Sequence, residues 1–190
     1  YSYHKFLLKG FEWTLINSGV KHSLKDSGYN KRRDECESAL KKIQSALPKI
    51  KNLYDLENIS ELKETVLTQE EKKRVMHVIG EKHRTSEILK FLQNGNAGAT
   101  GKTLYETHDS LSKLFEVSCT ETDYIVEFLK SFEITGARMI GGGFGGCVLV
   151  LSKKSQMDRF KENLFRDYKN KFYTELKFYS FKISDSVKEI

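Results

Sequence analysis

Apolar residues recur at helical spacing along much of the chain. One such stretch predicts a helix over residues 30–47, which Pro48, the only proline, would end because proline cannot continue a helix. Thr68, with glutamates two and three positions later, predicts the capped start of a longer helix that reaches Asn94.

The pattern changes from helical to alternating in the second half of the chain. Strands are expected where β-branched and other apolar residues run together, and the first residues of the chain show a weaker form of this pattern. The remaining expected elements are two short strands joined at Lys9 and Gly10, helices over 99–115 and after residue 120, strands at 137–140 and 147–151, a helix at 155–169 and a strand at 176–183. Long helices followed by strands, rather than repeated strand–helix–strand units, predict an α+β fold.

The composition is that of a globular protein with one large domain. The chain has 190 residues, of which 38% are hydrophobic and 31% charged, and no tract is apolar for long enough to span a bilayer. The first residues lack the layout of a secretory signal, and three widely spaced cysteines fit neither a disulfide framework nor a metal site. We therefore expect a soluble, cytoplasmic protein with no membrane partner.

The net charge of +6 could attract the phosphates of a nucleic acid or of a nucleotide. Acidic residues are interleaved with the basic ones, however, as in residues 31–35 and 70–74. This arrangement is typical of solvated helix faces, whereas a basic nucleic-acid-binding domain would gather its cations on one face. No nucleic-acid partner is expected.

Five glycines in six residues, at positions 141–146, are the most informative local feature. A hairpin needs only one or two glycines, whereas five let the backbone approach a ligand or another segment closely and can form an anion-binding nest. Phe144, in the middle, is expected to anchor the loop by packing. A P-loop is excluded because no Lys-Ser/Thr pair follows, and a dinucleotide fingerprint because a strand follows. A plain tight turn and a loop near phosphate or substrate both remain open.

Four ordered segments resemble galactokinases, which are GHMP small-molecule kinases. Residues 135–147, with the glycines, resemble their third signature motif, and residues 17–36, 74–84 and 106–119 fit the same family in order and spacing. The resemblance covers nearly the whole chain. It implies a ferredoxin-like GHMP kinase C-terminal domain, with several long helices packed on one face of a mostly antiparallel sheet.

The resemblance extends only to the second half of such an enzyme. The sugar-recognition segment, the serine-rich phosphate loop and the catalytic aspartate of galactokinases are not found in this sequence. The resemblance therefore implies that residues 1–24 are the last strands of a truncated N-terminal kinase domain and that residues 25–190 are the C-terminal domain. We expect the chain alone to be inactive, and the protein to be a monomer.

The family's reaction is phosphoryl transfer from ATP, with Mg²⁺, to the C1 hydroxyl of α-D-galactose. By resemblance, Tyr29 would contact galactose, and Lys21, where many relatives have arginine, would support the missing aspartate. Gly28 stands where an acid commonly precedes the tyrosine. No residue of this chain is assigned a catalytic role. The loop expected to support the nucleotide site comprises Gly141, Gly142, Gly143, Phe144, Gly145 and Gly146.

No metal ligands are expected, because the spacing of His77 and His83 does not place them on one helix face as a metal clamp. We expect instead that Glu81, Arg84, Glu106 and His108 join the two long helices through a partly buried polar network. Several alternatives remain open: a non-catalytic sugar sensor related to galactokinases, another GHMP kinase such as an N-acetylgalactosamine kinase, a basic nucleic-acid-binding domain, and a purely packing role for Tyr29.

Overall fold

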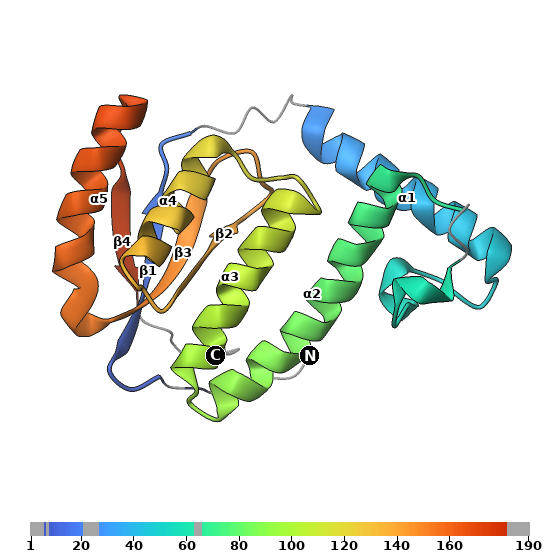
Figure 1. Ribbon diagram of the computed structural model, residues 1–190, viewed down its shortest axis with the longest axis horizontal. Coiled ribbons are helices and arrows are strands. Elements are labelled where there is room, and N and C mark those ends of the chain that lie inside the picture. The colour runs from blue at the N-terminus through green and yellow to red at the C-terminus, as the bar shows by residue number, and fades with distance from the viewer. Residues whose placement is uncertain (1–5, 7, 21–26, 63–65, 182–190) are drawn as a thin grey trace, which may run out of the picture.

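Four strands form one sheet in the order β2-β3-β1-β4, and each pair of neighbours is antiparallel. They are β1 (Phe11–Asn17), β2 (Gly136–Ile140), β3 (Cys147–Lys153) and β4 (Lys177–Phe181) (Figure 1). The structure is a computed structural model that describes residues 6, 8–20, 27–62 and 66–181.

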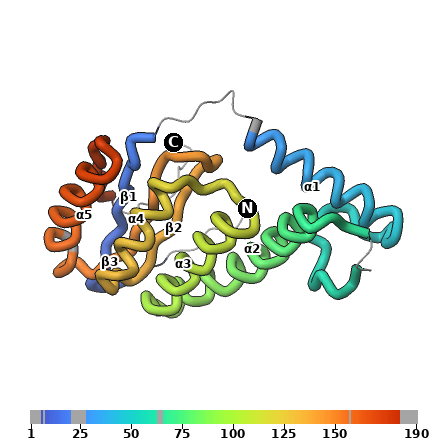
Figure 2. Tube along the Cα trace, turned by 45° about the horizontal axis from the view of Figure 1, so that its top comes forward, coloured from blue at the N-terminus to red at the C-terminus, as the bar shows by residue number. Residues whose placement is uncertain are grey.

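Five α-helices accompany the sheet within the described residues. They are α1 (Ser27–Ala46), α2 (Gln69–Gln93), α3 (Ala97–Lys113), α4 (Thr120–Ser131) and α5 (Met157–Phe172), with short 3₁₀ turns η1 (Leu53–Asp55), η2 (Ile59–Glu61) and η3 (Lys154–Gln156). Helices α4 and α5 pack on the sheet, α3 runs beside β2, and α2 and α1 extend to the side (Figures 1 and 2).

The order β1–α4–β2–β3–α5–β4, with β1 and β3 in the centre of the sheet, is the ferredoxin-like arrangement. Helices α1, α2 and α3 are inserted between β1 and α4. The expected α+β class and ferredoxin-like fold are therefore confirmed. Because β1 pairs with both β3 and β4, residues 11–17 share one sheet with strands from the second half of the chain. Where a domain boundary falls in a longer protein stays a prediction.

Alternation along the strands builds the main core. Ile16, Val148 and Met139 lie in one row across the sheet, and Val150 and Ala137 lie in the next, all of them buried. Apolar residues of α4 and α5 close over this face, including Ile125, Leu129, Phe160, Leu164 and Tyr168. This layer fixes the ends of β2 and β3, between which the glycine loop lies.

Local patterns in the sequence predicted most of the helices and strands correctly. Thr68 caps α2, since its hydroxyl accepts the Glu71 N–H at 3.2 Å and the Glu71 carboxylate accepts the Thr68 N–H at 2.8 Å. One expectation was wrong. Lys9 and Gly10 form a turn before β1, but Phe6 and Leu8, the described part of the first expected strand, are not in a strand.

A contact between two glycines brings α3 against β2. A Cβ built on Gly101 would lie 1.9 Å from the Thr135 carbonyl oxygen, and one built on Gly136 would lie 2.3 Å from the Gly101 Cα. No side chain fits between these two backbones. The helix can therefore approach the strand only because both positions are glycine.

Candidate functional site

The glycine loop, residues 141–146, joins β2 to β3. It lies at the same end of the molecule as the starts of α1 and α4 (Figure 1). Five of its six residues have positive φ: Gly141 at 94°, Gly143 at 92°, Phe144 at 59°, Gly145 at 134° and Gly146 at 82°. This backbone path accounts for the number of glycines, because side chains other than glycine rarely adopt these angles.

The second half of the loop is packed against other backbone. The Phe144 N–H donates to the Val117 carbonyl at 2.6 Å, and a Cβ on Gly143 would lie 2.5 Å from that same oxygen. A Cβ on Gly145 would lie 2.8 Å from Val20 Cγ1. This half of the loop is therefore a close-packed support.

Ser18 holds the end of the loop from the side of β1. Its N–H and its hydroxyl both donate to the Gly146 carbonyl, at 2.9 and 2.8 Å. The Ser18 carbonyl in turn accepts the Tyr168 hydroxyl at 2.7 Å, which ties this point to α5. Burial raises the pKa of Tyr168, so its hydroxyl stays protonated and able to donate.

The first half of the loop is open. Gly141 and Gly142 are exposed, and a Cβ built on either would meet no atom of the described residues within 4 Å. Their backbone is free to contact another segment or a ligand. The loop thus has a packed half that sets its position and an exposed half that faces outward.

The Phe144 side chain brings the start of α1 to the loop. A Cβ on Gly28 would lie 2.5 Å from Phe144 Cζ, so the ring packs directly on the helix backbone. The expected anchoring role of Phe144 is thereby confirmed. Gly28 is also explained, because any larger residue there would force the ring to move.

Of the expected sugar-site residues, Tyr29 lies next to this contact, as the third residue of α1. Its side chain is 59% exposed. The structure thus brings the tyrosine's helix and the glycine loop together. Lys21 lies outside the described residues.

The expected polar network between the long helices was wrong in its partners. Glu81 pairs with Arg84 of its own helix and with Arg138 of β2. Glu106 pairs with Lys102, one turn back in α3, and His108 faces Asp123 of α4. Two of these partners, Arg138 and Asp123, lie on other elements of the chain and could not be assigned from helical spacing alone.

His77 makes a polar link between α2 and α3. Its Nδ1 lies 2.8 Å from Ser110 Oγ, and its ring stacks on Phe115 with centroids 4.4 Å apart. Burial lowers the pKa of His77 to about 4, so the ring is neutral at pH 7. Within the described residues, no group of three or more His, Cys, Asp and Glu side chains is arranged to hold a metal ion.

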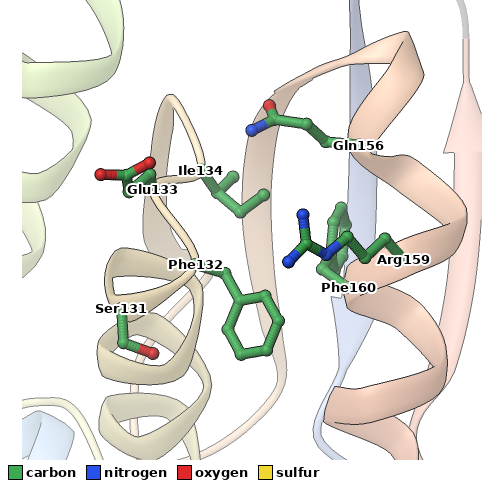
Figure 3. A pocket seen from close by; sticks show the side chains of 7 residues that line it. All are labelled: Ser131, Phe132, Glu133, Ile134, Gln156, Arg159 and Phe160. Atoms are coloured by element: carbon green, nitrogen blue, oxygen red, sulfur yellow. The ribbon is translucent and has the colours of Figure 1, made fainter.

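A separate hollow of about 390 Å³ lies at the other end of β2. Arg159 and Gln156 border it on the α5 side, and the chain that follows α4 borders it on the other (Figure 3). Because Ile134, in its lining, precedes β2 while the glycine loop follows that strand, this hollow is not part of the candidate site.

The chain is similar to known proteins along its length. The family profile described as "GHMP kinases C terminal" matches residues 88–170. A galactokinase from Thermotoga petrophila is 42% identical over 191 aligned residues, which cover 100% of this chain and 52% of the relative. The chain is similar to galactokinases over its whole length.

Solved structures show the same similarity to galactokinases. A Lactococcus lactis galactokinase in complex with galactose superposes with a TM-score of 0.85 at 29% identity, over 92% of this chain and 46% of that one. The L. major mevalonate kinase, at 17% identity and a TM-score of 0.58 over 93% of this chain and 44% of that one, shares the fold alone. The chain spans about half the length of the galactokinases it matches.

Sequence reasoning missed several residues that support the loop. Val117 acts through its backbone carbonyl, which leaves no signature in side-chain type, and Ser18 acts through its N–H as well as its hydroxyl. Arg74 could have been noticed, because a charged residue stands beside Val75 on the buried stripe of α2. No described helix is both long and apolar enough to cross a membrane.

Proposed function

We propose that this chain is the C-terminal half of a galactokinase, which phosphorylates α-D-galactose at C1 with ATP. The observation that carries the proposal is the 42% identity over the whole chain, together with the close superposition on a galactose-complexed galactokinase. The open half of the glycine loop fits a role beside nucleotide phosphates, because its exposed backbone leaves room for a ligand or for a phosphate loop of the longer protein.

In this proposal the chain supplies positioning rather than chemistry. Phosphoryl transfer depends mainly on alignment and charge neutralisation, and Mg²⁺-bound ATP would provide the transferred group. Gly141 and Gly142 would lie against the nucleotide site, while residues 143–146 hold them in place. Tyr29, exposed at the start of α1, would hydrogen-bond the sugar. Lys21 would support the catalytic aspartate of the longer protein. We assign no Mg²⁺ ligand to this chain, and we expect the enzyme to be monomeric and cytoplasmic.

The first test is the sugar-dependent activity of the full-length protein. We expect ATP-dependent formation of galactose 1-phosphate, slower turnover of N-acetylgalactosamine, and no turnover by residues 1–190 alone. Preference for N-acetylgalactosamine would overturn the assigned substrate. Galactose binding without any phosphate transfer would indicate a sensor instead.

The second test concerns Tyr29. In the full-length enzyme Tyr29→Phe removes one hydroxyl and should raise KM for galactose by several-fold to about tenfold, as expected for one lost hydrogen bond. KM for ATP should stay within about twofold, and steady-state kinetics would measure both. Tyr54→Phe is the matched control, since Tyr54 is similarly exposed, at 52%, but lies on η1. Equal effects on both substrates would leave Tyr29 as a packing residue.

A further inference from the structure

Arg74 is a buried charge that the proposed chemistry does not use. Its side chain is only 1% exposed, yet it lies on α2 between two carboxylates from other parts of the chain. Its Nε donates to Glu35 of α1 at 2.6 Å, and its Nη2 donates to Glu116 at 2.8 Å. Its Nη1 donates to the Leu114 carbonyl at the end of α3. A single guanidinium thus joins three segments with its fork of donors.

Neighbouring cations complete the cluster around these carboxylates. Arg32 of α1 lies 3.1 Å from Glu35 and 3.5 Å from Glu116, and Lys73 of α2 lies 2.7 Å from Glu116. Hydrogen bonds from Lys73 and Arg74 lower the pKa of Glu116 to about 2, so its carboxylate is charged at pH 7. The pairing is therefore complete at neutral pH.

Glu116 connects this cluster to the glycine loop. Its φ is 54°, a left-handed conformation that a residue with a side chain rarely adopts without support. The next residue, Val117, is buried, donates its N–H to the Leu111 carbonyl at 3.0 Å, and accepts the Phe144 N–H. Holding the Glu116 carboxylate thus helps to fix the direction of the Val117 carbonyl on which the loop rests.

These contacts form a closed ring. From Glu35 on α1 the ring runs through Arg74 to Glu116, then along the backbone to Val117 and across to Phe144. The Phe144 side chain returns to α1 at Gly28, next to Tyr29. Two elements that are distant in sequence are therefore held in register at two points, one apolar and one ionic.

We propose that Arg74 is a positioning residue that keeps α1, with Tyr29, and the glycine loop in register, so that the sugar-side and nucleotide-side elements of the kinase move together. The functional part rests on the proposed function, whereas the structural part does not. Lysine cannot replace arginine here, because one ammonium group cannot serve two carboxylates and a carbonyl in a fixed planar fork.

The structural test is amide hydrogen exchange in residues 1–190, read residue by residue by NMR. In Arg74→Lys the protection of the Phe144 amide should fall by about tenfold, as expected for the loss of one hydrogen bond to a charged group. Amides of β1 and β3 should keep their protection. Contacts between the Phe144 ring and the Gly28 Hα protons should weaken in the same variant.

Two further variants make the result decisive. Arg166→Lys is the matched control, because Arg166 is an exposed arginine of α5 paired with Asp167, and it should leave the Phe144 amide unchanged. If Arg74→Lys folds poorly, Glu116→Gln tests the same ring while conserving size. An unchanged Phe144 amide, or an equal loss of protection at all amides, would reduce Arg74 to a general stability residue.

The functional test uses the full-length kinase. Arg74→Lys should raise KM for galactose and for ATP together, by about threefold to tenfold each, whereas Tyr29→Phe should affect galactose alone. An effect of Arg74→Lys on kcat alone would contradict the coupling. If the protein proves not to be a kinase, the exchange experiment still decides whether Arg74 holds the loop, so the two proposals fail separately.

Discussion

The molecule combines two regions that are stabilised in different ways. The ferredoxin-like body, made of β1–β4, α4 and α5, encloses a large apolar core with aromatic side chains such as Tyr168 and Phe160. The helical arm, made of α1, η1, η2 and α2, has a smaller apolar core around Ile43 and Leu56. In Figure 1 the arm extends to one side of the body, with α3 between them.

The contacts that join the arm to α3 and the body differ along α2. Toward its start they are mostly polar, and include the Arg74 cluster and the hydrogen bond between His77 and Ser110. Toward its end Ile88 and Leu92 pack on an apolar cluster with Leu104 and Leu151. Apolar packing inside each region depends on volume and tolerates small adjustments, whereas charged hydrogen bonds require a defined geometry. The difference implies that the apolar contacts hold α2 against the body, and that the polar contacts set the position of the arm near the glycine loop.

The largest expected effect comes from Gly101→Ala, which disrupts the packing of α3 against β2 of the body. The new Cβ would clash with the Thr135 backbone at 1.9 Å, so α3 would have to move away from β2. We expect a loss of about 3–5 kcal/mol in the free energy of unfolding, measured by urea denaturation.

Gly98→Ala is the matched control in the same helix. A Cβ there would meet only Asn96 Oδ1, at 3.8 Å. Alanine should therefore be neutral, or stabilise the helix by up to about 1 kcal/mol. Equal stabilities for the two variants would mean that the contact between α3 and β2 is not close-packed.

The contact of Gly101 with Thr135 also shows which parts of the structure the sequence could predict and which it could not. Helices, strands and the Thr68 cap follow from patterns within a few residues, and those predictions were largely confirmed. Gly101 looks like an unfavourable residue inside a helix, and only the approach of Thr135, 34 positions later, explains it. Local pattern could not supply that partner.

The candidate site likewise contains some features that the sequence could predict and others that it could not. The glycine loop and Phe144 stand out in the sequence, because five glycines and one aromatic residue are unusual in so short a stretch. The Arg74 cluster could not be derived, since its carboxylates come from positions 39 residues earlier and 42 residues later in the chain. Helical spacing likewise paired His108 with the wrong partners, because Asp123 belongs to the next helix.

A smaller effect is expected at the glycine loop, whose packed and exposed halves can be compared directly. Gly143→Ala introduces a Cβ next to the Val117 carbonyl at a φ of 92°, and should cost about 2–3 kcal/mol in the free energy of unfolding. Gly142→Ala, in open space, should change it by no more than about 0.5 kcal/mol. Thermal unfolding of both variants gives the comparison, and a large loss from Gly142→Ala would show that the exposed half is also structural.

The most gradual effects are expected from protonation of the polar contacts, and they separate by pH. For His77 the pKa in the folded state, about 4, lies below its ordinary value of 6.5. The unfolded chain therefore binds the proton first, and the stability present above pH 6.5 is lost as the pH falls toward 4. For Glu116 the pKa falls from 4.5 to about 2, so its contribution is present above pH 4.5 and is lost only between 4.5 and 2.

Difference curves of unfolding free energy against pH would isolate the two groups, since other carboxylates also titrate in acid. The curve for the wild type minus His77→Gln should slope between pH 6.5 and 4, at no more than about 1.4 kcal/mol per pH unit. The curve for the wild type minus Glu116→Gln should be flat from pH 6.5 to 4.5 and slope only below pH 4.5, and more weakly, because Glu116 is 36% exposed and solvent screens its ion pairs. If both curves sloped in the same window, the two polar contacts would be coupled, and the arm would detach from the body as a unit rather than one contact at a time.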